Sequence, residues 1–316
     1  MPKIYAQKLN PKQKYKHQPK TLSGKRLTRR AFIRYGLRAA LLILIGSAYS
    51  LRDNVKTEKI RLRFSSLPPS FHGFRIVQIS DLHSSFWVTR AYLSRVVDQI
   101  NAMEKNIVVI TGDILTGSVN SFLKHWIPDD DDTYLSMVID VLRQLHGGAV
   151  KLAVLGNHDQ GDGSENARKL TYELDKIGFK VLRNNSLALM RGDEQIFIAG
   201  TDDLWFSCDL PKTLADVPEN AFKILLSHNP DINTEIRKKM QIDLTLCGHT
   251  HGGQVRIPFL TDYLMPINNP SRYMAGLVKE GYGYTYVNRG IGTLVFPFRL
   301  GAPPEITSFH LTCSDA

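Results

Sequence analysis

Histidine, aspartate and asparagine recur together in five short motifs along the chain. The motifs are Ser80-Asp81-Leu82-His83, Thr111-Gly112-Asp113, Gly156-Asn157-His158-Asp159, Ser227-His228-Asn229 and Gly248-His249-Thr250-His251. They contain five of the ten histidines of the 316-residue chain. Each motif alone is typical of an ordinary turn or surface pair. Carboxylate and imidazole groups gathered in one place are costly to bury unless they are paired or bind metal, so the set indicates a metal site if the motifs meet.

Each motif follows a short apolar run that predicts a buried strand. These runs lie at residues 75–80, 106–111, 151–155, 223–227 and 243–247. Helical periodicity follows each of the first three runs, at residues 89–104, 134–145 and 165–177. Such alternation predicts parallel strands whose carboxyl ends form one rim of a sheet. We therefore expect an α/β fold whose rim brings the five motifs together.

The second half of the chain is richer in strands. A hairpin is expected over residues 181–200, and further strands over residues 284–288 and 306–311. We expect one catalytic domain at residues 74–316, preceded by a linker and first strand at residues 52–73. The four aspartates at residues 129–132 predict a solvated loop before a helix. The three cysteines are widely spaced, which argues against a disulfide framework or a thiolate zinc site.

In residue type and order, the motifs resemble those of the calcineurin-like metallophosphoesterases: D-x-H, G-D, G-N-H-D, a lone H and G-H-x-H. The resemblance extends over about residues 74–311. It implies a four-layer α-β-β-α sandwich with mixed sheets and two divalent metal ions. The implied ligands are Asp81, His83 and His251 for one ion, Asn157, His228 and His249 for the other, and Asp113 bridging both.

The implied ligand set offers nitrogen and oxygen atoms without a thiolate. It favours Mn²⁺, with Fe²⁺ or Zn²⁺ as alternatives, over Ca²⁺. Two such ions about 3.5–4 Å apart can share a water molecule, lower its pKa and direct it at phosphorus. His158 is placed to protonate the leaving oxygen, with Asp159 holding its ring. The expected reaction is hydrolysis of a phosphodiester, phosphomonoester or pyrophosphate bond.

Two positions narrow the resemblance. Thr116 stands where purple acid phosphatases carry tyrosine, and His158 stands where the soluble UDP-2,3-diacylglucosamine hydrolases carry arginine. The segments at residues 248–254, 288–292, 297–299 and 303–306 are similar to those of membrane-associated bacterial phosphodiesterases, a branch that includes a UDP-2,3-diacylglucosamine pyrophosphatase. Arg289 and Arg299 are candidates to bind the substrate phosphate or, alternatively, to hold loops through ion pairs.

Several interpretations of the substrate stay open. The leading one is a phosphoester on a lipid-linked molecule at a membrane, and the alternative is the lipid A pyrophosphatase that releases UMP and lipid X. An interaction protein that binds metal without catalysis is an alternative of another class, which the intact motifs disfavour. Apolar stretches at residues 86–88, 204–206, 258–260 and 263–265 are expected either to pack in the core or to contact acyl chains or a membrane.

Positive charge is concentrated at the N-terminus. Residues 1–38 contain twelve of the 40 lysines and arginines and no acid, so the rest of the chain is near neutral although the formal net charge is +10. A nucleic-acid ligand is therefore not expected. Thr28-Arg29-Arg30-Ala31-Phe32-Ile33-Arg34 resembles a twin-arginine export signal, followed by an apolar signal core or membrane anchor at residues 39–51. We expect a bacterial protein at the cell membrane, either exported or anchored on the cytoplasmic face.

Overall fold

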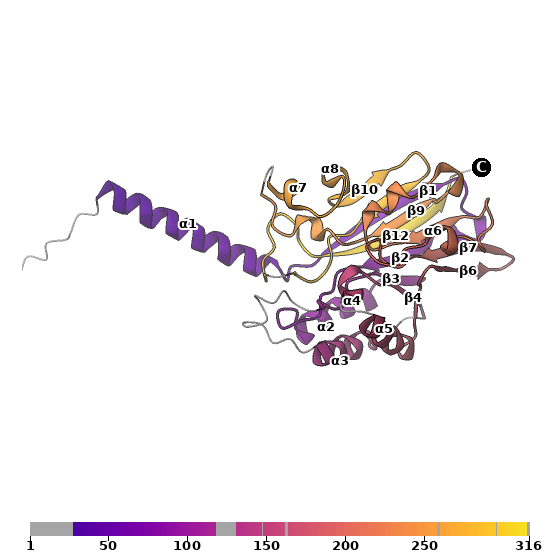
Figure 1. The fold of residues 1–316 in the computed structure, drawn as a ribbon, viewed down its shortest axis with the longest axis horizontal. Coiled ribbons are helices and arrows are strands. Elements are labelled where there is room, and N and C mark those ends of the chain that lie inside the picture. Colours follow the sequence, from indigo (N-terminus) through magenta and orange to yellow (C-terminus); the bar gives the residue numbers. More distant parts are fainter. Residues whose placement is uncertain are drawn as a thin grey trace, which may run out of the picture. The chain divides into compact units, whose positions relative to one another are not determined.

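The computed structural model describes residues 28–117, 131–146, 148–161, 164–257, 260–294 and 296–314 (Figure 1). Its contacts divide the chain into two units, Met1–Leu44 and Ile45–Ala316, and helix α1 (Arg29–Leu51) includes the boundary. Of the predicted acidic loop, residues 129 and 130 lie outside the described residues, and α3 (Asp131–Leu142) begins at the next position. Within the described part of the chain, no helix is both long and apolar enough to cross a bilayer.

The first of two six-stranded sheets in the body has the order β1-β12-β2-β3-β4-β5. Its strands are β1 (Lys56–Phe64), β2 (Phe74–Ile79), β3 (Ile107–Thr111), β4 (Val150–Val154), β5 (Phe179–Val181) and β12 (Glu305–Cys313). Strands β2 to β5 are parallel, whereas β12 is antiparallel to β2 and parallel to β1. The carboxyl ends of β2, β3 and β4 therefore lie at one edge, as the alternation predicts.

The second sheet has the order β10-β11-β9-β8-β7-β6. Its strands are β6 (Asn185–Arg191), β7 (Glu194–Gly200), β8 (Lys223–Leu226), β9 (Leu244–Cys247), β10 (Gly276–Lys279) and β11 (Tyr284–Val287). Strands β7, β8, β9 and β11 are parallel, and the outer strands β6 and β10 are antiparallel to their neighbours. The expected hairpin is the β6–β7 pair.

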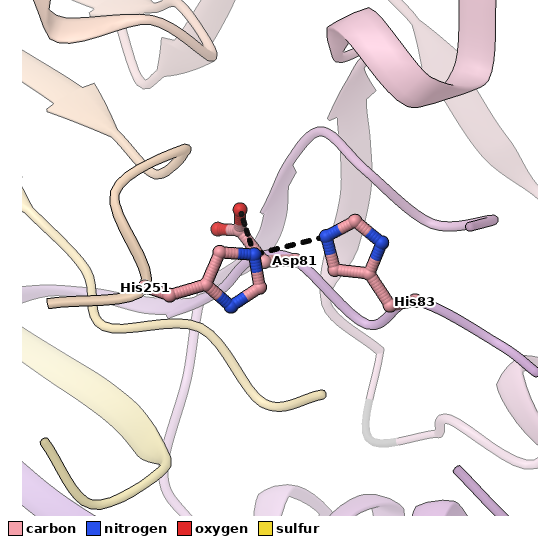
Figure 2. Close-up of side chains that lie close together, drawn as sticks. All are labelled: Asp81, His83 and His251. Carbon is pink, nitrogen blue, oxygen red and sulfur yellow. Dashed lines mark hydrogen bonds and ion pairs between the residues drawn. The ribbon is translucent and has the colours of Figure 1, made fainter. Parts of the chain in front are cut away.

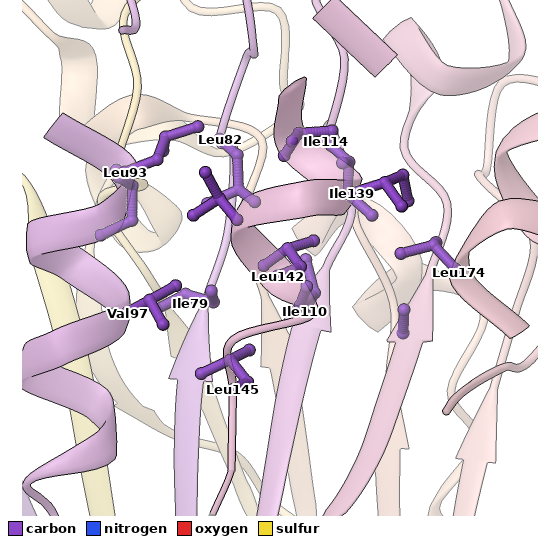
Figure 3. Close-up of a cluster of buried hydrophobic side chains, with 14 of the residues drawn as sticks. Ile79, Leu82, Leu93, Val97, Ile110, Ile114, Ile139, Leu142, Leu145 and Leu174 are labelled. Atoms are coloured by element: carbon purple, nitrogen blue, oxygen red, sulfur yellow. The ribbon is translucent and has the colours of Figure 1, made fainter. Parts of the chain in front are cut away.

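Helices cover the outer face of the first sheet. They are α2 (Arg90–Asn101), α3 and α5 (Ser164–Lys176), which Figure 1 shows on one side of the sheets. In the core beneath these helices, Val97 of α2 lies beside Ile79 of β2, and Leu93 lies beside Leu82 (Figure 3). Apolar side chains four positions apart share one face of a helix, which is why the predicted stripe on α2 is the buried one.

Two further cores complete the sandwich. One lies between the two sheets and includes residues of both. The other lies outside the second sheet, against the short helices α6 (Leu210–Thr213), η2 (Pro230–Thr234) and α8 (Pro270–Tyr273). Three cores separate four layers, so the predicted α/β sandwich with mixed sheets is confirmed.

Strand β1 extends the first sheet along its whole edge. It pairs with β12 from Lys56 to Phe64, and Leu62 and Phe64 enter the core between the sheets. Much of the segment expected as a linker and first strand therefore belongs to the body. Strand β10 has no counterpart among the predicted strands, because four residues that begin with a glycine carry too short an apolar pattern.

Candidate metal centre

The five motifs follow β2, β3, β4, β8 and β9 directly, and the third and fifth motifs run into the short helices α4 (Asn157–Gln160) and η4 (His251–Gly253). Gln78 joins the two sheets directly below these loops. Its Nε2 donates hydrogen bonds to Thr111 Oγ1 and to the carbonyl of Cys247, each at 2.9 Å. The loops of both sheets therefore meet at one rim, where we expected the motifs to converge.

Asp81, His83 and His251 form the first cluster of donor groups at this rim (Figure 2). The Nε2 atoms of His83 and His251 are 3.0 Å apart, and His251 Nε2 is 3.4 Å from Asp81 Oδ1. All three residues are buried. Two imidazole nitrogens and a carboxylate oxygen thus face one small volume.

Asp113, His228 and His249 form the second cluster. His228 Nε2 lies 3.1 Å from Asp113 Oδ2 and 3.2 Å from His249 Nδ1. Asn157 completes the group, with its Oδ1 3.0 Å from His249 Nδ1. The Nδ1–H of His228 donates to the carbonyl of Thr111 at 2.7 Å, so its Nε2 atom faces the cluster.

One carboxylate oxygen belongs to both clusters. Asp113 Oδ2 lies 3.1 Å from His228 Nε2 and 3.5 Å from His83 Nε2. The other oxygen, Oδ1, accepts the backbone N–H of His158 at 2.9 Å, which fixes the orientation of the carboxylate. Asp113 therefore lies between the two clusters, and its role as a bridging ligand stays a prediction.

Five of these side chains start from a left-handed backbone. The positive φ angles are 49° at Asp81, 45° at His83, 53° at Asp113, 73° at His249 and 52° at His251. Each such residue costs about 1–3 kcal/mol, although aspartate and histidine tolerate this conformation better than most. Strain that is concentrated on the converging residues is typical of a functional site.

Two glycines allow the loops to approach the carboxylates. A Cβ atom at Gly156 would collide with the Asp113 carboxylate, and one at Gly248 would collide with Ser80 Oγ and the Asp81 carboxylate. The glycines of the third and fifth motifs are thus required by close packing.

Burial determines the charge of most of the histidines. It lowers the pKa of His83 and of His249 to about 3, and it lowers the pKa of His251 well below its ordinary value. Burial alone would also lower the pKa of His228, but the adjacent Asp113 carboxylate outweighs burial and raises that pKa well above its ordinary value. Most of the rings are therefore neutral donors at neutral pH, the form in which histidine binds metal.

The separations within the clusters fit metal coordination. A cation with bonds of about 2.0–2.2 Å places neighbouring donor atoms roughly 2.9–3.5 Å apart. The separations given above run from 3.0 Å between His83 and His251 to 3.5 Å between His83 and Asp113. Two imidazole nitrogens and a carboxylate oxygen that converge at these separations are the donor atoms that a divalent transition-metal cation binds. The residues present thus fit two divalent cations held by nitrogen and oxygen ligands.

His158 lies beside the clusters and joins neither. Its Nδ1–H donates to the carbonyl of Thr116 at 2.6 Å. Its ring packs edge-on against the ring of His83, with the centroids 5.0 Å apart. The carbonyl therefore leaves the Nε2 atom of His158 as the one able to exchange a proton near the first cluster.

Asp159 does not orient the His158 ring, which corrects the expectation from the sequence. Its Oδ1 accepts the backbone N–H groups of Ile114 and Leu115 at 2.9 Å, and its Oδ2 accepts that of Gly156 at 3.0 Å. Burial raises the pKa of this carboxyl to about 7. The carboxylate ties the loop after β3 to the loop after β4, and sequence order alone gave no sign of these backbone contacts.

Arg299 is fully buried beside the first cluster. Its guanidinium donates to the carbonyls of Ala302 at 2.9 Å, Arg289 at 3.0 Å, Gly292 at 3.1 Å and His251 at 3.3 Å. Arg299 thus holds neighbouring loops together, as in the loop-holding alternative, but through backbone carbonyls instead of ion pairs.

Arg289 is also occupied within the protein. Its Nη2 lies 2.7 Å from a carboxylate oxygen of Glu58, and its Nε lies 2.9 Å from one of Glu305. The ion pairs join β1 to the loop before β12, which again matches the loop-holding alternative.

Two residues near the second cluster had no individual role in the sequence interpretation. Trp205 packs edge-on against His249, with ring centroids 4.8 Å apart, and is 51% exposed. Asp203 is fully buried, and its Oδ1 accepts the backbone N–H of Trp205 at 2.9 Å. The position of Asp203 could have identified it from the sequence, because Asp203 follows strand β7 just as the five motifs follow their strands.

A two-sheet α/β sandwich with adjoining histidine–carboxylate clusters at its strand ends defines the metallophosphoesterases, which hydrolyse phosphoesters. The calcineurin-like phosphoesterase family pattern matches residues 74–253, a segment that contains all seven expected ligands. The chain belongs to this family.

Relatives of the chain support the same class. An uncharacterized metallophosphoesterase of Bacillus subtilis, YkuE, is 34% identical over 91% of this chain and 98% of its own. The phosphodiesterase YaeI of Escherichia coli is 31% identical over 80% of this chain and 88% of its own. A protein of Danio rerio named transmembrane protein with metallophosphoesterase domain is 28% identical over 92% of this chain and 67% of its own.

Proposed function

We propose that the chain is a phosphodiesterase that works with two divalent cations, of which Mn²⁺ is the favoured metal. Asp81, His83 and His251 hold one cation, Asn157, His228 and His249 hold the other, and Asp113 bridges them. When bound, two such cations activate a water molecule and offset the charge that develops on the phosphoryl oxygens. The observation that carries the proposal is the position of Asp113 Oδ2. This oxygen lies 3.1 Å from His228 Nε2 of its own cluster and 3.5 Å from His83 Nε2 of the other cluster.

His158 is the proton donor to the leaving oxygen in this proposal. The Thr116 carbonyl holds its Nδ1–H at 2.6 Å, so the protonated ring can give up only its Nε2 proton. Asp159 supports this geometry indirectly, since it joins the loop that carries His158 to the loop that carries Asp113.

A lipid-linked phosphodiester at a membrane is the proposed substrate. The Escherichia coli relative is named a phosphodiesterase, and the Danio rerio relative is named a transmembrane protein. Trp205, beside His249, gives the rim a large, half-exposed aromatic surface that suits acyl chains. The twin-arginine-like segment at residues 28–34 is the proposed export signal.

Metal analysis combined with a substrate pair tests the proposed activity. The full chain is loaded with Mn²⁺ and assayed on bis-p-nitrophenyl phosphate and on p-nitrophenyl phosphate. We expect two ions per chain and faster hydrolysis of the diester. Absence of hydrolysis in protein that holds two ions would contradict the proposed activity, and faster hydrolysis of the monoester would contradict the phosphodiesterase assignment.

A second comparison separates the two candidate lipid substrates. The loaded protein is offered a phospholipid diester and UDP-2,3-diacylglucosamine, and a reporter fused to the C-terminus locates the body. Export with turnover of the phospholipid is expected. Cytoplasmic location with release of UMP would replace our assignment with the pyrophosphatase.

A further inference from the structure

Large apolar side chains are exposed on the loops that surround the metal-bearing rim. They are Phe86, Trp205, Phe206, Tyr263, Leu264 and Phe296, and we call them the rim collar. Their exposed fractions run from 50% for Phe206 to 85% for Tyr263. Each costs free energy in water at about 25 cal/mol per Å² of apolar surface, so a group of them in one place indicates a binding surface.

The collar follows the carboxyl ends of strands in both sheets. Phe86 comes after β2, Trp205 and Phe206 after β7, α7 (Leu260–Leu264) after β9, and Phe296 after β11. All four strands end at the metal-bearing rim, because β2 is parallel to β3 and β7, β8, β9 and β11 are parallel. The collar residues therefore lie on the connections that leave this rim, and Trp205 packs directly against His249 of the second cluster.

Hydrogen bonds connect the collar loops to the ligand loop of the second sheet. Thr261 of α7 donates its hydroxyl to the carbonyl of Val255 at 3.1 Å. The Nε2 of Gln254, three residues after His251, donates to the carbonyl of Phe296 at 3.1 Å. A surface that docks through the collar would therefore lie over the metal centre.

The last turn of α1 attaches at the same loop. The carbonyl of Ala48 accepts the backbone N–H of Arg299 at 3.1 Å, and Tyr49 packs edge-on against Phe298 with centroids 6.4 Å apart. The side chain of Arg299 in turn holds the carbonyl of the ligand His251. The apolar N-terminal segment is thus bonded to the loop that supports the first cluster.

We propose that the rim collar docks on an anionic phospholipid bilayer, with the metal centre facing the headgroup layer. The inference rests on the proposed lipid phosphodiesterase function and specifies how the substrate is reached. A bilayer is the favoured occupant because the collar loop is bonded to the last turn of α1, whose apolar run and preceding bases direct the chain to a membrane. Tryptophan and tyrosine at the collar are the residues that prefer the bilayer interface.

Lipid contact can be measured at the collar itself. Full-length, Mn²⁺-loaded protein is mixed with vesicles of phosphatidylcholine and phosphatidylglycerol in equal parts, with bromine on the acyl chains. Bromine in contact with tryptophan quenches its fluorescence, and the Trp205→Phe variant isolates the signal of Trp205. We expect Trp205 to be quenched. Absence of that quenching would overturn the proposal. The collar would then bind a protein or have no partner.

Substitutions in α7 give the matched comparison. Tyr263→Ser with Leu264→Ser should weaken vesicle binding at least about fivefold. Tyr172→Ser with Met190→Ser, on α5 and β6, removes side chains that are each 62% exposed away from the rim and should leave binding unchanged. Equal binding by both double variants would contradict docking through the collar.

The soluble diester separates docking from catalysis. Both double variants should hydrolyse bis-p-nitrophenyl phosphate like the parent chain, while the α7 variant loses at least about fivefold on a vesicle-borne phosphodiester. If the parent chain hydrolyses neither substrate but Trp205 is still quenched, the phosphodiesterase assignment fails and the docking surface stands.

Discussion

The Asp113 carboxylate is the residue at which the two donor clusters meet. Its Oδ1 is fixed by the backbone N–H of His158, which leaves Oδ2 between His83 and His228. The same backbone that positions the proposed bridge therefore also carries the proposed proton donor. This arrangement relates metal binding to proton transfer through a single loop.

Replacement of His158 tests its role in proton donation. The His158→Gln variant should keep two metal ions and lose about 10²–10⁴-fold in rate on a diester with an alkoxide leaving group. The loss should be smaller with p-nitrophenolate, which leaves without a proton. His146→Gln, on an exposed histidine, serves as the control and should hydrolyse both substrates normally. An unchanged rate for His158→Gln on the alkoxide substrate, with full metal content, would remove His158 from the mechanism.

Metal uptake should release a proton at neutral pH. In the metal-free protein, the Asp113 carboxylate raises the pKa of His228 above its ordinary value despite burial, so the ring holds a proton that a cation must displace. Affinity at the second cluster should therefore increase with pH up to that raised pKa. Calorimetric titration with Mn²⁺ in buffers of different ionisation enthalpy measures the released proton. Heats that do not depend on the buffer would contradict this linkage.

Residue types and order were enough to predict which groups converge, since the motifs follow strands in a parallel arrangement. The contacts of Asp159 and Arg299 were beyond such reasoning. Both side chains bind backbone groups that lie on other loops, and main-chain acceptors and donors leave no residue-specific mark in a sequence.

At the scale of elements, the buried side chain of Arg299 holds several parts of the loop between β11 and β12. The guanidinium of Arg299 satisfies four carbonyl groups, including that of the ligand His251. A buried carbonyl that loses its partner costs about 1–3 kcal/mol. The loop that supports the first cluster is thus stabilised from the side opposite the metal.

Arg299→Met should destabilise the protein by about 3 kcal/mol or more, because several carbonyls lose their donor at once. It should also lower metal content, since the His251 loop loses its support. Urea unfolding and metal analysis measure the two effects. Arg143→Met, on a side chain that is 59% exposed, is the control and should change little. Unchanged unfolding of Arg299→Met would show that the loop is held by other contacts.

Helices and strands with a strong apolar pattern could be predicted from the sequence, and those with a weak pattern could not. The buried runs of β2, β3 and β4 and the apolar stripe of α2 were evident, because burial on both sides or on one face constrains every residue. Strand β10 was not predicted, because its side chains alternate between half-buried and exposed positions at a sheet edge. Edge strands need fewer apolar residues and give weaker signals.

At the scale of the whole molecule, charge and catalysis belong to different parts of the sequence. The twelve N-terminal bases carry the positive charge, while the body is near neutral. Bound cations would supply the local positive charge that attracts a phosphate to such a body.

Removal of residues 1–44 tests this division. The shortened chain keeps Ala48 and its bond to Arg299, so it should hydrolyse bis-p-nitrophenyl phosphate at the rate of the full chain. It should bind vesicles that contain phosphatidylglycerol more weakly, and the binding that remains should depend less on salt. Co-sedimentation at low and high salt measures both effects. Salt-dependent binding equal to that of the full chain would place the lipid-attracting charge in the body.

The most direct test of the account is the number and coupling of bound Mn²⁺ ions. Electron paramagnetic resonance of the loaded full chain should show two ions per chain with the exchange-coupled spectrum of a bridged pair, because one oxygen of Asp113 faces both clusters. Asp113→Ala should abolish the coupling. One ion per chain, or two ions with uncoupled spectra, would contradict a bridged dinuclear centre.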